Sequence, residues 1–234
     1  MEKIRINKFI AETGICSRRE ADKLIQAGKV NINGKKAELG ATVSEEDTIT
    51  VNGKPVKIQN QKIYIAFHKP FGVITTTDKN SENTVMDYID LKTRVYPIGR
   101  LDVHSSGLIL LTNDGDIVNR ILKSKHKLEK EYLVTLNKSI TDEHVQKMCD
   151  GIDLDGQTTL PAKVSKINNR QIRMILIQGM NRQIRRMCEK LGYEIKILKR
   201  VRVGTITLEG LARGKWRHLT KKEVASLATS SGVF

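Results

Sequence analysis

The stretch IGRLDVHSSGLILL, which runs from Ile98 to Leu111, joins the densest group of polar residues in the sequence to a short apolar run. The run Leu108–Leu111 contains no polar side chain, which predicts a strand buried on both faces. Asn113-Asp114-Gly115 follows and predicts that this strand ends there. The polar group therefore lies directly before a buried strand.

Arg100 and Asp102 are the members of this group that could carry chemistry. In an extended segment their side chains share a face, while Leu101 packs the other way. A carboxylate held beside a guanidinium stays ionised at neutral pH, so Asp102 could act as a nucleophile or a base. The other interpretation is an ordinary turn in which Asp102 and Ser105 satisfy backbone groups, and this explains the Arg–Asp pair less well.

The segment after residue 60 mixes strand and helix patterns without strict β-α-β alternation. Apolar alternation and short apolar runs predict strands at 63–67, 73–77, 132–136, 172–177 and 201–206. Helical spacing predicts helices near 117–122 and 141–149, a third that Asn181 caps and Gly192 ends, and a last one capped by Thr220. This mixture predicts an α+β fold.

Residues 1–60 form a separate small unit of two short helices followed by strands. Ser17-Arg18-Arg19-Glu20 is a capping box, which predicts a helix start, and two Asn-Gly pairs predict tight turns. The polar segment Val56–Lys62 divides the chain into domains at 1–60 and 61–234. Arg18 and Arg19 lie beside the free backbone N–H groups of the helix start, where they could bind a phosphate. Alternatively, they belong to a solvated first turn.

The charge of the chain favours a polyanionic partner. Its 234 residues include 41 basic and 26 acidic side chains, a formal net charge of +15. Residues 181–222 hold 13 of the basic and 3 of the acidic side chains, so two thirds of the excess lies in one stretch. This concentration favours nucleic acid, bound through phosphate contacts, over a solubility effect or contact with an anionic membrane.

Several classes of protein and site are not expected. No apolar run reaches the length of a membrane span, and the start MEKIRINKF lacks the apolar core of a secretory signal. Cys16, Cys149 and Cys188 form no disulfide pattern, so we expect a cytoplasmic protein without membrane association. Neither nucleotide-cofactor loops nor metal-ligand motifs occur, so no cofactor and no metal site are expected.

Four motifs follow one another along the chain. They are KPFG at 69–72, GRLDVHSSGLILLTNDG at 99–115, KEY at 130–132 and GMNRQIRRM at 179–187. In sequence and spacing they resemble the motifs of pseudouridine synthases of the RsuA-like branch, whose hallmark is GRLDxxSxGLLLLTNDG. Residues 1–60 resemble the αL RNA-binding domain that this branch shares with a small-subunit ribosomal protein. The resemblance therefore covers nearly the whole chain.

The resemblance implies a fold, a reaction and a substrate. The fold is a small αL domain followed by a catalytic domain with a mixed, mainly antiparallel sheet. The reaction isomerises a uridine of RNA to pseudouridine, a redox-neutral change that needs no cofactor. The start of the last motif, Gly179-Met180-Asn181, is similar to the RluF subgroup, which modifies 23S rRNA. A stem-loop of 23S rRNA is therefore the expected partner, with tRNA as a possible second one.

The resemblance also implies roles for individual residues. Asp102 would be the nucleophile that attacks either the ribose C1′ or the uracil C6. Tyr132 would stack on the flipped-out uracil, Arg185 would pair with Asp102, and Arg100 would enter the stack where the base has left. Further RNA contacts are expected at Leu101, Val103, Arg182, Gln183, Ile184, Arg186, Arg18 and Arg19.

Simpler interpretations exist for some of these residues. Tyr132 could be an ordinary sheet aromatic, and Ile184 could be plain core. Helical spacing predicts that Arg182, Arg185 and Arg186 share one face, which could be a solvated face.

Other functions remain open. The same reaction could act on another rRNA site or on a tRNA anticodon loop. A non-catalytic ribosome-assembly protein would predict a broken set of Asp, Tyr and Arg, whereas all three are present here. A ribosome-recycling factor built around the αL domain would leave most of the chain unexplained. No obligate protein partner is evident.

Overall fold

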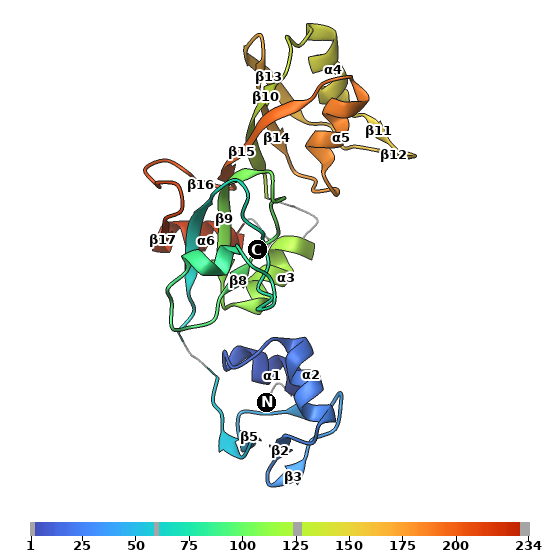
Figure 1. Ribbon diagram of the computed structural model, residues 1–234. Coiled ribbons are helices and arrows are strands. Elements are labelled where there is room, and N and C mark those ends of the chain that lie inside the picture. The colour runs from blue at the N-terminus through green and yellow to red at the C-terminus, as the bar shows by residue number, and fades with distance from the viewer. Residues whose placement is uncertain (1–2, 59–60, 124–127, 230–234) are drawn as a thin grey trace. The chain divides into compact units, whose positions relative to one another are not determined.

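The computed structural model describes residues 3–58, 61–123 and 128–229, which form two compact units (Figure 1). The first unit comprises the chain up to Ile63 together with Leu91–Val95 and Asn113–Gly115, and the second comprises the rest. Residues 59 and 60 lie outside the described residues, so the expected domain boundary at 60/61 stays a prediction.

Two short helices and small sheets make up the first unit. Its elements are β1 (Ile4–Arg5), α1 (Ile6–Glu12), α2 (Arg18–Gln26), β2 (Val30–Ile32), β3 (Lys35–Lys36), β4 (Thr42–Val43), β5 (Ile49–Val51) and β6 (Lys54–Pro55). The strands β3, β2, β5 and β6 form an antiparallel sheet in that order, and β1 pairs with β4. Both helices bury apolar side chains in one core that also takes in Val30, Val43 and Ile49.

Local signals in the sequence explain this unit well. The Ser17 hydroxyl accepts a hydrogen bond from the Glu20 N–H at 3.2 Å, and the Glu20 carboxylate accepts one from the Ser17 N–H at 2.7 Å. The predicted capping box is therefore confirmed. Asn33-Gly34 and Asn52-Gly53 all have positive φ and close the β2–β3 and β5–β6 hairpins, as Asn-Gly turns do.

A mixed sheet of nine strands runs through the second unit. The elements up to the middle of the unit are β7 (Tyr64–Lys69), the 3₁₀ helix η1 (Val85–Tyr88), β8 (Tyr96–Pro97), β9 (Ser106–Thr112), α3 (Gly115–Lys123), β10 (Lys130–Leu136) and α4 (Asp142–Asp150). The later ones are β11 (Asp153–Leu154), β12 (Gln157–Thr158), β13 (Lys163–Asn168), β14 (Gln171–Leu176), α5 (Gln183–Lys190), β15 (Ile195–Val203), β16 (Ile206–Thr207), β17 (Trp216–His218) and α6 (Lys221–Thr229). The strand order is β13-β14-β10-β15-β9-β7-β17, with β16 beside β15 and β8 beside β9.

Two apolar cores support this sheet. In one, α4 and α5 pack on the part formed by β13, β14, β10 and β15, with Val134, Met148 and Met187 fully buried. In the other, α3 and α6 pack near β9, with Leu108 and Ile206 fully buried (Figure 1). None of the helices within the described ranges is long and apolar enough to cross a membrane. The α+β class with a mainly antiparallel sheet is confirmed.

Three predictions about elements are wrong. Residues 73–77 form no strand. Within this segment, Ile74 makes an isolated bridge to Thr84. Asn181 does not cap α5: Arg182 is the N-cap, with φ 48°, and makes no side-chain capping bond. The segment 201–206 is not one strand, since β15 ends at Val203 and turns into β16.

One parallel contact, between β9 and β15, joins the two halves of the large sheet. Ser106 pairs with Lys199 and Gly107 pairs with Arg200, whereas every other strand pair of this sheet is antiparallel. Gly107 has φ 111°, and a Cβ added there would lie 2.1 Å from the Arg200 carbonyl oxygen. The Arg200 Nε also donates a hydrogen bond to the Leu108 carbonyl at 2.7 Å, which adds a second contact between the two strands. The junction therefore requires a residue without a side chain.

Gly107→Ala is expected to lower the free energy of unfolding by about 3 kcal/mol or more. Overpacking costs about 1–3 kcal/mol and the positive φ adds about 1–2 kcal/mol. Gly156→Ala is the matched control, because Gly156 has φ 82° but nothing within 4 Å of an added Cβ. Urea unfolding of both variants measures the difference. Equal losses would contradict the close approach at the junction.

Candidate active site

A pocket of about 270 Å³ opens where the sheet junction meets α5. Its lining includes Arg100, Leu101, Asp102, Tyr132, Arg182, Gln183, Ile184 and Arg185. The structure thus brings together eight of the residues predicted from the sequence. Val103 and Arg186 do not line this pocket, and Arg18 and Arg19 belong to the other unit.

The loop that carries Asp102 is fixed from both sides. Leu101 before it is buried, and the Thr75 hydroxyl donates to the Leu101 carbonyl at 2.8 Å and accepts from its N–H at 3.4 Å. Behind it, the Ser105 N–H donates to the Asp102 carbonyl at 3.0 Å. The Asp102 side chain stays 38% exposed, so its carboxylate is held at the pocket wall and can still reach a ligand.

Arg185 faces Asp102 across the pocket. Its Nε lies 3.9 Å from the Asp102 Oδ2, which is ion-pair distance without a hydrogen bond. The Arg185 Nη2 instead donates to the His104 carbonyl at 2.6 Å and to the Ser105 hydroxyl at 3.3 Å. Burial lowers the pKa of Arg185, an effect that Arg182 strengthens and Asp102 opposes. The expected pair therefore exists as a charge contact, anchored by the loop that follows Asp102.

Lys69 and Arg200 are two buried cations that the sequence analysis did not assign to the site. The Lys69 side chain is fully buried and its Nζ donates to the Pro70 carbonyl at 3.0 Å and the Val103 carbonyl at 3.5 Å. Burial lowers the pKa of Lys69 to about 8, and the charge of Asp102 opposes that shift. Arg200 lines the pocket and pairs with Gly107 on one side and with Tyr132 on the other.

The signals for these two cations were weak. Lys69 stood in a motif that reads as a turn, and Arg200 stood in a run of charged residues whose strand pattern is interrupted. Position within the sheet, which no short segment reveals, places Arg200 in the pocket lining and lets Lys69 bond the Val103 carbonyl in the loop of Asp102.

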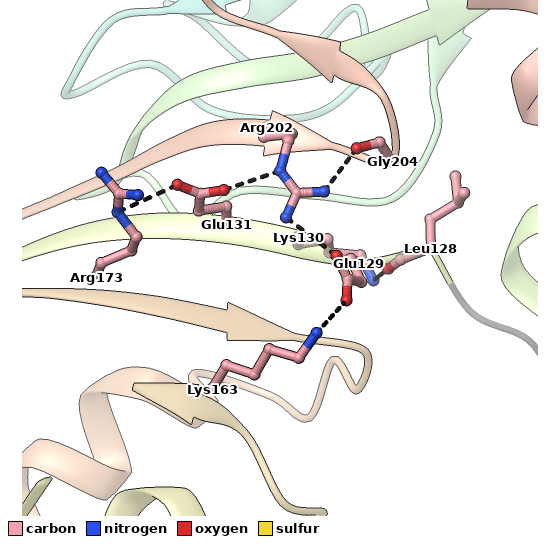
Figure 2. Close-up of polar contacts among 8 residues, drawn as sticks. All are labelled: Leu128, Glu129, Lys130, Glu131, Lys163, Arg173, Arg202 and Gly204. Atoms are coloured by element: carbon pink, nitrogen blue, oxygen red, sulfur yellow. Dashed lines mark hydrogen bonds and ion pairs between the residues drawn. The ribbon is translucent and has the colours of Figure 1, made fainter. Parts of the chain in front are cut away.

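Tyr132 lies on β10 beside an irregularity in the sheet. The pairing of β10 with β15 shifts register between Glu131 and Tyr132, so that Tyr132 pairs with Arg200. Figure 2 shows how Arg202 spans this point: its Nε donates to Glu131 at 2.8 Å, its Nη2 to Glu129 at 3.1 Å and its Nη1 to the Gly204 carbonyl at 2.7 Å. The hydrogen bond to Glu131 is the main cause that raises the pKa of Arg202.

The same network extends outward to two further cations. Arg173 on β14 forms an ion pair with Glu131 at 3.5 Å, and Lys163 on β13 bonds Glu129 at 3.3 Å (Figure 2). Four strands are thereby tied together where Tyr132 enters the pocket.

The start of α5 differs from the predicted arginine face. Arg182 lies before the helix and forms an ion pair with Glu189 at 3.8 Å. Gln183 is buried, and its side chain accepts from the Met180 N–H at 3.1 Å. Arg186 bonds Asp155 in the turn between β11 and β12 at 2.6 Å. Arg182 lies outside the helix in a left-handed conformation, yet it lines the pocket together with Arg185.

In the first unit, Arg18 and Arg19 open α2 as predicted. Arg18 is partly engaged, since its Nη2 donates to Asn7 at 3.3 Å, and Arg19 is exposed.

Comparison with known proteins identifies the family. A model of the RNA pseudouridylate synthase family matches residues 63–190, and an S4-domain model matches residues 4–49. The chain belongs to the RNA pseudouridylate synthase family. It is an RsuA-type synthase with an S4 domain, an isomerase that acts on RNA.

Relatives and one solved structure agree with this. The chain is 46% identical over 226 residues to the dual-specificity RNA pseudouridine synthase RluF of Escherichia coli K12, covering 96% of this chain and 78% of the relative. It is 39% identical over 232 residues to ribosomal large subunit pseudouridine synthase B of Bacillus subtilis, covering 95% of each. A crystal structure of a pseudouridylate synthase matches with a TM-score of 0.72 and 32% identity over 96% of this chain and 99% of that one.

Lys69→Met is expected to change how the stability of the synthase depends on pH. Burial lowers the pKa of Lys69 in the folded protein to about 8, whereas the pKa of an unfolded lysine is about 10.5. Between these values the unfolded chain binds more protons, so this lysine makes the unfolding free energy rise with pH. Relative to the variant, the free energy of unfolding of the wild type should rise by up to about 3 kcal/mol between pH 7.5 and 10.5.

Urea unfolding at several pH values measures this gain. Lys163→Met, at a highly exposed lysine, serves as the control and should show no such trend. If the difference in unfolding free energy between wild type and Lys69→Met is the same at every pH, burial does not lower the pKa of Lys69.

Proposed function

We propose that this synthase isomerises one uridine in a stem-loop of large-subunit (23S) rRNA in the cytoplasm, where ribosomes are made. The observation that carries the proposal is the match over 95% of both chains to a synthase whose name assigns it to the large ribosomal subunit. The Gly179-Met180-Asn181 start of the last motif supports the same substrate. A tRNA anticodon loop is the second candidate, because another relative is named a dual-specificity enzyme.

Asp102 is the nucleophile in this proposal. Its carboxylate oxygen bonds to either the ribose C1′ or the uracil C6, the N1–C1′ bond breaks, and the detached uracil rotates. A C5–C1′ bond then forms, C5 loses its proton, N1 carries one, and the carboxylate is released. Electrons and atoms balance without a redox partner. The Arg185 guanidinium lies 3.9 Å from the Asp102 carboxylate that makes this attack, and the buried Lys69 lies under the same loop.

The other residues of the pocket bind and orient the base. The ring of Tyr132 stacks on the uracil, and the network around Arg202 fixes the strand that carries it. Exposed Arg100 enters the space that the flipped base leaves in the RNA stack. Its side chain there offsets part of the unstacking energy that flipping the base costs. Arg182 and Arg186 contact the RNA backbone near the pocket. Arg186 first has to release Asp155 before it can bind a phosphate. Leu101, Gln183 and Ile184 shape the wall behind the base, and Val103 contacts the RNA outside the pocket.

Residues 1–60 act as the RNA-positioning domain in this scheme. Exposed Arg19, partly engaged Arg18 and the capped start of α2 offer a cation and backbone N–H groups to one phosphate. Phosphate contacts fix register but carry no base information.

Arg19→Ala is expected to raise KM for RNA several-fold, leave kcat unchanged, and lower the salt dependence of binding by about one unit of log–log slope. Lys54→Ala, an exposed lysine of the same unit, is the control for loss of charge alone. A fall in kcat at saturating RNA would show that Arg19 shapes the active site instead.

Pseudouridine mapping in cells that lack the gene tests the proposed substrate and nucleophile together. One 23S rRNA uridine should lose its modification, wild type should restore it, and Asp102→Asn should not, although its RNA affinity should persist. Loss at a site in 16S rRNA or tRNA alone would refute the proposed substrate. Restoration by Asp102→Asn at more than about a tenth of the wild-type rate would refute the nucleophile.

A further inference from the structure

Phe71 is an exposed aromatic ring in a protein that has few aromatic residues. Aromatic residues make up 4% of the chain. Among the described residues, Phe71 and Tyr88 are the exposed ones, at 55% and 36%. Tyr88 packs on Phe67, with ring centroids 5.6 Å apart. The neighbour of Phe71 is instead the ring of His104, whose centroid lies 5.4 Å away at a tilt of 41°.

This ring pair is attached to the loop that carries Asp102. His104 follows Asp102 by two residues, so their Cα atoms lie within about 8 Å of each other. The Arg185 side chain donates to the His104 carbonyl at 2.6 Å while its Nε faces Asp102. The His104 ring is therefore carried by the same anchored loop as the Asp102 carboxylate, although neither it nor Phe71 lines the pocket.

The backbone under Phe71 is fixed as well. The Gly72 N–H donates to the Val103 carbonyl at 2.8 Å, and the Asn83 Nδ2 donates to the Gly72 carbonyl at 2.9 Å. Gly72 has φ 85°, which suits the tight turn. The buried Lys69 holds the carbonyls of Pro70 and Val103. Phe71 is thus presented to solvent on a rigid turn rather than on a loose loop.

A single exposed apolar side chain needs no explanation, since many occur on protein surfaces. A rigidly held Phe–His pair beside a catalytic carboxylate, with Arg100 exposed two residues before that carboxylate, is a more specific arrangement. Unpaired bases of RNA stack on Phe, Tyr, Trp and His rings, and nearby cations hold the backbone. These features fit a nucleobase better than they fit an apolar protein segment.

We propose that Phe71 and His104 form a stacking platform for the nucleobase next to the target uridine. When the target base leaves the stack, its neighbour loses a stacking partner on one face. The ring pair offers a replacement within reach of the neighbouring nucleotide. This inference rests on the proposed action at a flipped uridine and adds a subsite that reads the flanking base.

Substitutions at Phe71 test the platform in the full-length synthase. With a 23S rRNA transcript as the probe, Phe71→Ala and Phe71→Leu should each raise KM by about tenfold, and Phe71→Trp should stay near wild type. Leucine keeps apolar area but has no π face, which separates stacking from simple burial. Because the ring contacts the neighbouring base and not the reacting atoms, kcat should stay within about twofold.

Ile167→Ala is the matched control, because Ile167 is 46% exposed on β13, which carries neither the loop of Asp102 nor the turn of Phe71. It should leave KM unchanged. Equal effects of Ile167→Ala and Phe71→Ala, or a Phe71→Leu variant that behaves as wild type, would overturn the proposal. A loss of kcat at saturating RNA would also overturn it, because it would assign the ring to the structure of the active site.

RNA with an abasic nucleotide on the 5′ or the 3′ side of the target uridine identifies the contact directly. On one of these two RNAs, Phe71→Ala should cost no further affinity, since the base that it contacts is already gone. Equal costs of Phe71→Ala on intact and both abasic RNAs would refute the platform.

The same experiment separates this inference from the proposed substrate. If the wild type leaves 23S rRNA unmodified but modifies a tRNA anticodon loop, the proposed substrate is wrong. The coupling between Phe71 and the flanking base is then measured on that anticodon loop, with the same criteria.

Discussion

The contact of Gly107 with the backbone of Arg200 is the constraint on which the large unit depends. Each half of its sheet has its own apolar core and its own helices, and the two halves meet through two residue pairs of parallel strands. Asp102 lies just before β9 on one half, while Tyr132 and Arg185 belong to the other. A side chain at position 107 would push the strands apart and separate the carboxylate from its partners. The glycine of the signature motif thus sets the geometry of the junction.

The junction also determines the electrostatics of the pocket. Arg200 lies on β15, the strand between β9 and β10. Lys69 is the last residue of β7, and its Nζ donates to the Val103 carbonyl in the loop of Asp102. Placing several cations in a partly dry pocket is costly unless anions or hydrogen-bond acceptors compensate them. Main-chain carbonyls of Pro70, Val103, His104 and Leu108 supply much of that compensation here. The Asp102 side chain is 38% exposed and forms no tight salt bridge, since the Arg185 Nε lies 3.9 Å from it.

Features with local causes could be read from the sequence. The capping box at Ser17, the Asn-Gly hairpins and the buried strand at Leu108–Leu111 each depend on neighbouring residues alone. The cap at Thr220 is of the same kind, because its hydroxyl accepts from the Glu223 N–H at 3.2 Å. The signature motif likewise placed Asp102, Tyr132 and Arg185 in one pocket.

Features that depend on distant strands could not be read in this way. The strand β13 has no buried residue, and its sequence shows no apolar alternation, so the pattern does not predict a strand there. Arg182 replaces Asn181 as the cap of α5 because Gln183 turns back to Met180, a contact that composition does not reveal. The pairing of Arg186 with Asp155 and the network of Arg202 needed the fold before they could be seen.

The outer edge of the sheet at β13 has a consequence for self-association. An edge strand exposes unpaired N–H and C=O groups that can pair with an identical strand of a second molecule. On β13, Lys163 pairs with Glu129 and Lys166 pairs with Asp142, so a strand arriving at this edge would have to strip water from two ion pairs. Charged side chains at such an edge oppose intermolecular sheet growth. The residues that made β13 hard to recognise in the sequence are therefore the ones that protect the sheet from aggregation.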